Sequence, residues 1–442
     1  MRHAVLLSVL SGAAAVVPVL AVAGTDATRF AVRPAGPAGD AAPAGAAGPA
    51  PAAGAGAPRV VEYRGLRVPV PAGWQVHRLD ADPARCVRYD RHAVYLGRPG
   101  PQQDCPARIV GRTEAVHIEP AGHGRGSRTV VRADRLAALT IAPNAGHETR
   151  LTLPEAGVMI TGVYGRDPGR LQRMLRAARL SAEWTAAPRA SLASSRPDVR
   201  REAPDEATAP GAGLDRPWVR GKGFDTCTAP SLATMEAWRP SFKVTNIYIG
   251  GAARGCAQPN LTASWVTRVR AMGYRVTPTY VGLQAPCGTR PQRFTAKNAA
   301  KQGAKAAVDA ARNARGLGIP EGEPIYYDME AYNSRKKACR AAVLRFVDRW
   351  VKRLGAEGYV PCLYSSAKSG IRDVGRATGI SKPAAVWFAN WNGRASVRDD
   401  PYLPDHWWSP HRRIKQYRGG HKERHGGVTL NIDSNIADGR VY

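Results

Sequence analysis

The chain has 442 residues and a formal net charge of +29. This length allows two or more domains with a sizeable core. The charge is weak evidence for nucleic-acid binding, because only 12 of the 64 basic residues are lysine and an arginine-rich, lysine-poor composition often reflects a GC-rich genome. The sequence also has no zinc-finger spacing and no aromatic platform for single strands, so we expect no specific nucleic-acid partner.

Residues 1–23 have the pattern of a secretory signal peptide. Arg2 precedes an apolar run that ends in Ala21-Val22-Ala23, a small-x-small cleavage pattern. A membrane anchor is the rival interpretation, but a glycine and a proline interrupt the run. We expect cleavage before Gly24 and a secreted, extracellular or cell-wall-associated protein, with no membrane span in the remaining chain. The positive charge would then attract anionic wall polymers, and salt would screen that attraction.

Residues 24–58 are mostly Ala, Gly and Pro, which predicts a flexible linker. Residues 59–185 contain short apolar runs separated by turn residues, and we interpret them as a small β-rich domain. Its predicted strands include Leu66–Val70, His92–Leu96, Glu114–Ile118 and Val158–Val163. A helix from Pro168 closes the domain, because the apolar residues there keep the spacing of one helical face. No group of catalytic side chains gathers in this domain, and its role is open.

Residues 186–216 return to a linker composition of Ala, Ser, Pro and mixed charges. In residues 217–442, strands and helices alternate regularly. The predicted strands are Gly223–Thr226, Asn246–Gly250, Val276–Val281, Ile325–Glu330, Pro361–Ser365, Val386–Trp391, Arg413–Tyr417 and Leu430–Asp433. The predicted helices are Leu232–Trp238, Thr262–Met272, Thr295–Leu317 and Ala338–Leu354. This pattern favours an α/β fold, a (β/α)8 barrel whose later helices are reduced to loops, and a doubly wound open sheet is the rival.

The stretch Pro324–Tyr332 runs an apolar strand directly into two carboxylates, Asp328 and Glu330. Side chains alternate faces in a strand, so Tyr326, Asp328 and Glu330 share one face. Acids at the end of a buried strand need partners, a substrate or a metal to offset their desolvation. A strand-end ion pair is the simplest alternative to a functional site.

A barrel of this kind predicts that chemistry lies at the carboxyl ends of the strands. The polar and aromatic residues at those ends are Asp225, Asp328, Glu330, Asn390, Trp391, Gln416, Tyr417 and Asp433. The first and eighth strands are neighbours in a closed barrel, so Asp225 and Asp433 should lie side by side. Trp391 and Tyr417 offer flat faces on which a sugar ring can stack. The residues assigned to substrate binding are Trp391, Asn390, Tyr417, Gln416 and Tyr326.

An acidic site with aromatic walls suits glycosidic-bond cleavage, in which one carboxyl group protonates the leaving oxygen while another stabilises positive charge on the sugar. A metal-dependent phosphodiesterase or deacetylase is an alternative, because several carboxylates can bind a hard divalent cation. Against it, no histidine flanks these acids, and His421, Glu423 and His425 follow the seventh strand with the spacing of a solvated turn. We therefore expect no metal and no cofactor.

Residues 221–442 resemble the actinobacterial secreted glycoside-hydrolase-like domain, a TIM barrel related to the family 25 lysozymes. The matching motifs are Gly223-Phe224-Asp225, Asp328-Met329-Glu330, Gln416-Tyr417 and Asn431-Ile432-Asp433. The resemblance implies that Glu330 is the proton donor. It also implies that the supporting carboxylates are Asp225, Asp328 and Asp433. It also implies action on a cell-envelope glycan such as peptidoglycan, and a barrel that binds the wall without turnover is the alternative.

Seven cysteines in an exported chain suggest disulfide bonds and one remaining thiol. One pair lies in the first domain, and the others follow neighbouring strands of the barrel. The expected bonds are Cys86–Cys105, Cys227–Cys256 and Cys287–Cys339. Cys362, inside an apolar strand, is expected to be a buried and inert thiol. We expect the protein to be a monomer.

Overall fold

The computed structural model describes residues 59–122, 129–186 and 217–442. The expected signal peptide and both expected linkers lie outside these residues, except for Ala186, and so they stay predictions. The described residues belong to one compact unit, which includes both the N-terminal β-rich region and the C-terminal barrel. Within the described residues, no helix combines the length and the apolar character that a membrane crossing needs.

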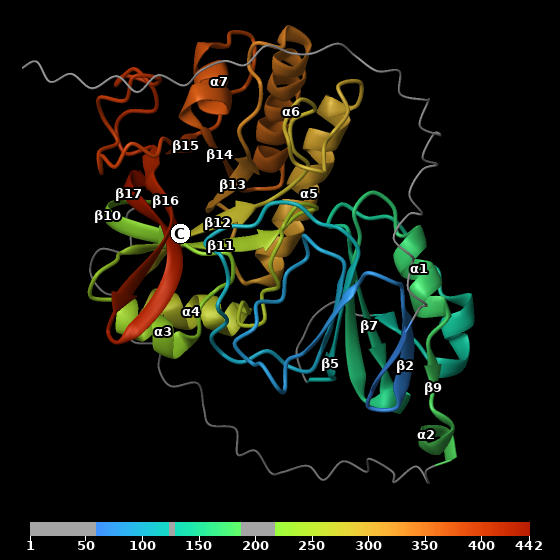
Figure 1. Cartoon of the computed structure of the whole chain (residues 1–442). Helices are drawn as coiled ribbons and strands as arrows, with labels where there is room; N and C mark the ends of the chain where they lie inside the picture. The colour runs from blue at the N-terminus through green and yellow to red at the C-terminus, as the bar shows by residue number, and fades with distance from the viewer. Residues whose placement is uncertain (1–58, 123–128, 187–216) are drawn as a thin grey trace, which may run out of the picture. The chain divides into compact units, whose positions relative to one another are not determined.

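The N-terminal region, residues 59–186, contains two sheets, which Figure 1 draws in blue to green. The smaller sheet has the order β1 (Arg59–Tyr63), β2 (Leu66–Val70), β9 (Arg179–Leu180). The larger sheet has the order β3 (Gln75–Arg78), β4 (Ala93–Leu96), β5 (Ala115–Pro120), β8 (Val158–Val163), β7 (Glu148–Leu153), β6 (Thr129–Val130). Its helical segments are two 3-10 turns, Ala133–Ala138 and Pro154–Ala156, and α1 (Gly169–Arg176) and α2 (Ala182–Ala186). The expected β-rich character is confirmed, and α1 buries the apolar face that its spacing predicted.

The C-terminal region is a closed barrel of eight strands in sequence order. The strands are β10 (Trp218–Asp225), β11 (Val244–Gly250), β12 (Arg275–Tyr280), β13 (Pro324–Met329), β14 (Val360–Ser366), β15 (Ala385–Ala389), β16 (Arg413–His425) and β17 (Val428–Arg440). The helices between them are α3 (Leu232–Trp238), α4 (Ala263–Ala271), α5 (Ala299–Gly316), α6 (Lys337–Ala356), a π-helical turn at Ala367–Ile371, and α7 (Arg372–Arg376). Side-chain caps start α3 and α4, where Ser231 and Thr262 accept from backbone amides three residues on.

The last strand corrects the expected (β/α)8 architecture. β17 is antiparallel to both of its neighbours, β16 and β10, so the closed barrel is mixed in orientation. Gly426 and Gly427, both with positive φ, form the tight turn that joins β16 to β17 as a long hairpin. His421, Glu423 and His425 therefore lie on β16 and not on a loop, which corrects the interpretation of a solvated turn.

Apolar side chains pack on both faces of the barrel wall, one layer inside the barrel and one between the strands and the helices. Tyr326 and Cys362 belong to a cluster contributed by the strands alone, which fills the barrel interior. Ile325 and Tyr327, on the opposite face of β13, belong to the larger cluster shared with the helices. The alternation predicted for this strand is thus confirmed. It places Asp328 on the inward face, at the end of the strand.

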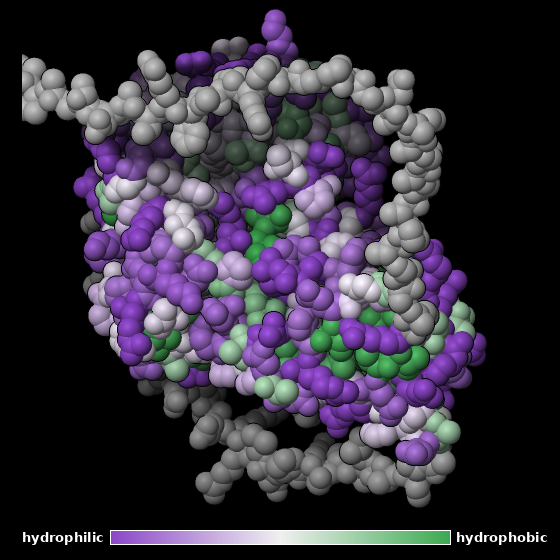
Figure 2. Space-filling model, in the orientation of Figure 1, coloured by the Kyte–Doolittle hydropathy of each residue, from purple (hydrophilic) through white to green (hydrophobic). Residues whose placement is uncertain are grey.

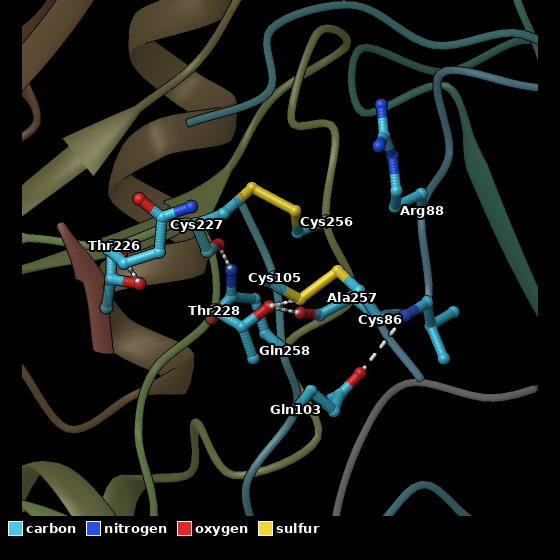
Figure 3. Close-up of a disulfide and its surroundings, with 12 residues drawn as sticks. Cys86, Arg88, Gln103, Cys105, Thr226, Cys227, Thr228, Cys256, Ala257 and Gln258 are labelled. Carbon is cyan, nitrogen blue, oxygen red and sulfur yellow. Dashed lines mark hydrogen bonds between the residues drawn. A yellow bond between two sulfur atoms is a disulfide. The ribbon is translucent and has the colours of Figure 1, made fainter. Parts of the chain in front are cut away.

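The three expected disulfide bonds are formed, and Cys362 is a buried free thiol. Burial raises the pKa of the Cys362 thiol to about 12. Figure 3 shows the Cys86–Cys105 bond of the N-terminal region beside the Cys227–Cys256 bond of the barrel loops. The four cysteines form one apolar cluster, and Thr228 contacts Cys105 across it. The two regions are therefore packed directly against each other at this point.

The surface is strongly polar. Figure 2 shows a face covered mainly by hydrophilic residues, with small apolar patches between them. Among large apolar side chains of the described residues, Trp391 is one of the few that is exposed, at 53%. It follows β15, at the same end of the barrel as the acidic residues, and is a candidate for contact with a ligand.

Candidate active site

The four acids predicted from the sequence all lie at the end of the barrel where the parallel strands finish, called the mouth below. Asp225 ends β10, Asp328 is near the end of β13, Glu330 follows it, and Asp433 lies in β17. All four are buried, and Glu330 is the most accessible of them at 8% exposure. The burial of several carboxyl groups in one place requires compensating donors or cations.

Asp225 and Asp433 meet across the pair of strands that closes the barrel. They are direct partners in the antiparallel register of β10 and β17. Because β17 runs the other way, Asp433 reaches the mouth from the middle of its strand, and not from the strand end that the sequence suggested. Gln416 of β16 donates through Nε2 to Asp225 Oδ2 at 3.0 Å and to Asp433 Oδ2 at 3.2 Å. Asn435 donates to Asp225 Oδ1 at 2.5 Å.

Burial favours the protonated form of both carboxyl groups in this pair. Burial, and then the neighbouring Asp433, raise the pKa of Asp225 well above its usual range, against the hydrogen bonds from Asn435 and Gln416. Burial also raises the pKa of Asp433, although Arg108 opposes the shift. Two carboxyl groups that share one amide donor in a buried site favour a state with a proton between them.

Asp328 and Glu330 are held by one side chain from the loop after β12. Gln284 donates through Nε2 to the Asp328 carbonyl at 2.8 Å and accepts from the Glu330 backbone N–H at 2.7 Å. The Asp328 Oδ1 atom is buried and has no hydrogen-bond partner among the described residues. Burial, and then Glu330, raise the pKa of Asp328 well above its usual range, against Arg108 and Arg290. Gln284 therefore fixes the backbone of both acids and leaves their carboxyl groups to other partners.

Two arginines, neither expected from the sequence, contact these acids. Arg290 donates to Glu330 Oε2 at 2.8 Å. Arg108 comes from the N-terminal region, and its Nε lies 3.7 Å from Glu330 Oε1 while its Nη1 lies 3.8 Å from Asp433 Oδ2. The same Nη1 donates to the Tyr364 hydroxyl at 2.8 Å. One guanidinium thus links the acid of β17 to the acid that follows β13.

The aromatic and amide residues divide into two groups. Trp391 belongs at the mouth, because its Nε1 donates to Gln416 Oε1 at 2.9 Å and Arg108 lies 5.0 Å from its ring. Tyr417, next to Gln416, is partly exposed. Asn390 instead donates to Asp400 at 2.8 Å.

Tyr326 does not join the site. It is fully buried inside the barrel, and its hydroxyl donates to the Arg440 carbonyl at 2.8 Å. Arg440 ends β17 at the end of the barrel away from the mouth, where it pairs with Trp218. The shared strand face was predicted correctly, but Tyr326 lies deeper in the barrel than the acids, so its assignment to substrate binding is corrected to a core role.

Sequence reasoning missed five residues that complete the site: Arg108, Gln284, Arg290, Tyr364 and Asn435. Asn435 lies two residues after Asp433, and the alternation of the strand would have placed it on the same face. Tyr364 lies near the end of β14, a strand that was predicted. Gln284, Arg290 and Arg108 lie outside the regular elements, where periodicity gives no signal.

The cysteines are a poor metal site. Among the described residues, the group of potential ligand atoms within 4.8 Å of one another consists of Cys86, Cys105 and Cys256. All three sulfurs are in disulfide bonds and offer no thiolate. The acids at the mouth accept hydrogen bonds from the amide of Gln416 and lie beside the two guanidinium groups.

Comparison with known proteins finds one family model that matches the barrel. Residues 236–437 match the family model described as the Rv2525c-like, glycoside hydrolase-like domain. The match includes Asp328, Glu330 and Asp433, whereas Asp225 lies before its start. No curated protein matches the chain.

Three solved structures show a weak likeness to part of the chain. An uncharacterized protein of B. stearothermophilus is 22% identical, with a TM-score of 0.34, over 50% of this chain and 99% of that one. The spore cortex lytic enzyme SleM of Clostridium perfringens is 16% identical, with a TM-score of 0.31, over 46% and 62%. The catalytic domain of a Listeria monocytogenes bacteriophage endolysin is 13% identical, with a TM-score of 0.30, over 50% and 93%. Likenesses at this level do not assign a function to the present chain.

Proposed function

We propose that the barrel hydrolyses glycosidic bonds in a cell-envelope glycan, with peptidoglycan as the substrate class. The observation that carries the proposal is the meeting of acids from β10, β13 and β17 at one mouth, where Gln416 joins two of them and Arg108 joins Glu330 to Asp433. Glycosidases need such a set, because one carboxyl group protonates the leaving oxygen and others stabilise the positively charged sugar.

Glu330 is the proton donor in this proposal. Its backbone is fixed by Gln284, and its carboxyl group is the most accessible of the four acids. Asp225 and Asp433, on the opposite side of the mouth, share one proton, and the negative charge that remains on the pair stabilises an oxocarbenium-like transition state. Trp391 offers an exposed ring face for stacking on a sugar.

The substrate class rests on three further observations. The matched family model is described as glycoside hydrolase-like. Three disulfide bonds suit an oxidising, extracellular compartment, where an envelope glycan is accessible. The net charge of +29 favours approach to anionic wall polymers.

A barrel that binds the wall without turnover is the second candidate, and one observation favours it. The four acids are at most 8% exposed, and a guanidinium from the same chain already contacts two of them. In this state the mouth holds the charge pattern of a hydrolase but presents little of it to a polymer.

The experiment is incubation of the full chain with purified peptidoglycan. Released reducing ends and soluble fragments measure turnover, and co-sedimentation with the insoluble polymer measures binding. Both are followed for the wild type, for Arg108→Ala and for Arg108→Ala combined with Glu330→Gln. Release that depends on Glu330 and persists in a chelator supports the glycosidase. Binding without release in every variant supports the second candidate, and release that a chelator abolishes points to a metal-dependent hydrolase.

A further inference from the structure

We propose that the N-terminal region, residues 59–186, is an intramolecular inhibitor of the barrel, in which Arg108 occupies the position of the reacting sugar. The inference rests on the proposed function, because it takes the mouth as the place where a glycan binds. It assigns a role to a region in which the sequence shows no catalytic groups, and it explains why the acids of the mouth are buried.

Arg108 contacts the groups that the proposed chemistry would use. Its guanidinium is surrounded by side chains from β13 to β17 and their loops, and its own side chain is only 16% exposed. The contacts are Tyr364 Oη at 2.8 Å, Gln416 Oε1 at 3.4 Å, Glu330 Oε1 at 3.7 Å, Asp433 Oδ2 at 3.8 Å and the Trp391 ring at 5.0 Å. A sugar that stacked on Trp391 and reached Glu330 would have to displace this guanidinium.

The segment that carries Arg108 is anchored by backbone hydrogen bonds of the residues that directly follow it. Gly255 N–H donates to the Ile109 carbonyl at 3.3 Å, and Gly111 N–H donates to the Ala253 carbonyl at 2.7 Å. Both barrel residues lie in the loop after β11, which borders the mouth. Arg108 is therefore positioned by a short stretch of paired backbone, and not by its own side-chain contacts alone.

A second anchor follows immediately. Gln292, in the loop after β12, accepts from the Arg112 backbone N–H at 2.7 Å and donates to the Arg112 carbonyl at 2.6 Å. The Arg112 guanidinium donates to Glu148 at 3.0 Å, and Arg254 of the barrel donates to the same carboxylate oxygen at 3.1 Å. A partly buried carboxylate of the N-terminal region is thus shared by one arginine from each region.

Close backbone approach makes this contact sensitive to a single methyl group. A Cβ added at Gly255 would collide with the side chain of Ile109 and would come within 2.6 Å of its carbonyl oxygen. Gly255→Ala should therefore move the Arg108 segment away from the barrel, while every residue of the mouth is kept. This gives a way to open the mouth without altering its chemistry.

The charge pattern favours inhibition over substrate recognition by Arg108. An arginine that recognises an anionic group of a substrate keeps some N–H groups of its guanidinium free to bind that group. Here the guanidinium is packed among two carboxyl groups, a phenol, an amide and an indole of the barrel itself. Its charge offsets that of the acids, and its volume fills their shared space.

The test compares the full-length wild type with Arg108→Ala, Gly255→Ala and a control, Arg67→Ala, in an exposed ion pair on β2. Each variant is incubated with purified peptidoglycan, and fragment release and co-sedimentation are measured. An inhibited barrel is competent only as a minor population of about 0.1–10%, so Arg108→Ala should raise the rate of release by about 10- to 1,000-fold. Gly255→Ala should raise it as well, and Arg67→Ala should leave it unchanged. Thermal unfolding of each variant establishes that it is folded.

The outcomes separate the two proposals. Equal or lower release by folded Arg108→Ala and Gly255→Ala, from a wild type that is itself active, overturns the inhibitor. Of these two results, only a lower release by Arg108→Ala would make Arg108 a substrate-binding residue. Absence of both binding and release in all four proteins overturns the proposed function instead. A gain in both variants that Glu330→Gln then removes supports both proposals.

Discussion

Asp225 and Asp433 lie opposite each other on two antiparallel strands, and a single amide, that of Gln416, donates to both of them. The two carboxyl groups on this side of the mouth are therefore held in place by one neutral side chain. Gln416 in turn accepts hydrogen bonds from Trp391 and Tyr364, so it joins the acids to the aromatic side of the mouth.

Gln416→Ala should destabilise the folded protein, because it leaves two buried carboxyl groups without their common donor. The free energy of unfolding should fall by about 1–3 kcal/mol. Urea denaturation followed by tryptophan fluorescence measures the change. Gln75→Ala, at an exposed position on β3, is the control and should alter stability by less than about 0.5 kcal/mol. An equal effect of the two substitutions would contradict the bridging role.

Glu330→Gln should remove turnover in the Arg108→Ala background, because the amide keeps the shape of the carboxyl group but has no proton to donate. The expected loss is about 100- to 10,000-fold. Co-sedimentation with peptidoglycan should stay nearly unchanged, since stacking on Trp391 does not need the proton. If the double variant releases fragments as fast as Arg108→Ala alone, Glu330 is not the proton donor.

The Glu148 contact should make stability depend on acid pH. Burial alone would raise the pKa of Glu148, but Arg150, Arg254 and Arg112 outweigh it and hold the pKa well below its ordinary value of 4.5. Since the folded-state pKa is the lower one, the network stabilises the protein above pH 4.5, and this contribution is lost as the pH falls below that value.

Glu148→Gln should therefore lower the free energy of unfolding by about 3–5 kcal/mol at neutral pH, because two buried arginines lose their partner. The difference from the wild type should shrink as the pH falls below 4.5. Urea titrations at several pH values test this. Asp134→Asn, at a site whose side chain is 64% exposed, is the control and should show no such gap. A difference in the free energy of unfolding that stays constant with pH would contradict the link between Glu148 ionisation and stability.

Gly303→Ala and Gly316→Ala form a matched pair within α5. At Gly303 a Cβ would collide with the backbone carbonyl oxygen of Phe346 in α6, and Figure 1 shows these two helices side by side. We expect a loss of about 1–3 kcal/mol from forced separation of the helices. At Gly316 nothing lies within 4 Å, so alanine should be neutral or stabilise by up to about 1 kcal/mol. Thermal unfolding distinguishes the two, and destabilisation by both would count against the close contact.

Cys362 should resist alkylation in the folded protein, because it is buried in the barrel interior and burial raises its pKa to about 12. Iodoacetamide at neutral pH should add no mass to the native chain. The same reagent in denaturant, without reductant, should add one adduct, because the other six cysteines are in disulfide bonds. Rapid labelling of the native protein would show that the strand opens.

Much of this fold can be predicted from the sequence, because its elements have strong local signals. Leu232–Trp238 was predicted with the bounds that α3 has, and the alternation along β13 placed Asp328 on the inward face. Disulfide pairs on neighbouring loops could also be deduced, since consecutive strands of a barrel are adjacent in space. The same reasoning brought Asp225 and Asp433 together.

The direction of β17 and the role of Arg108 could not be predicted in this way. An alternating pattern reads the same in both directions, and only the Gly426-Gly427 turn signals the hairpin. Arg108 stands in an irregular segment, and one arginine among many carries no signal of its own. Its place depends on the docking of two regions, which no local pattern encodes.

The closure of the barrel also sets an order of events during synthesis. β17 is the last strand to be made, so Asp225 and Asp433 meet only when that strand pairs with β10. Residues 59–186 are synthesised before β17, and regions near the N-terminus generally fold first. The acids therefore meet in the presence of Arg108, and under the inhibitor proposal the mouth is occupied as soon as it is complete.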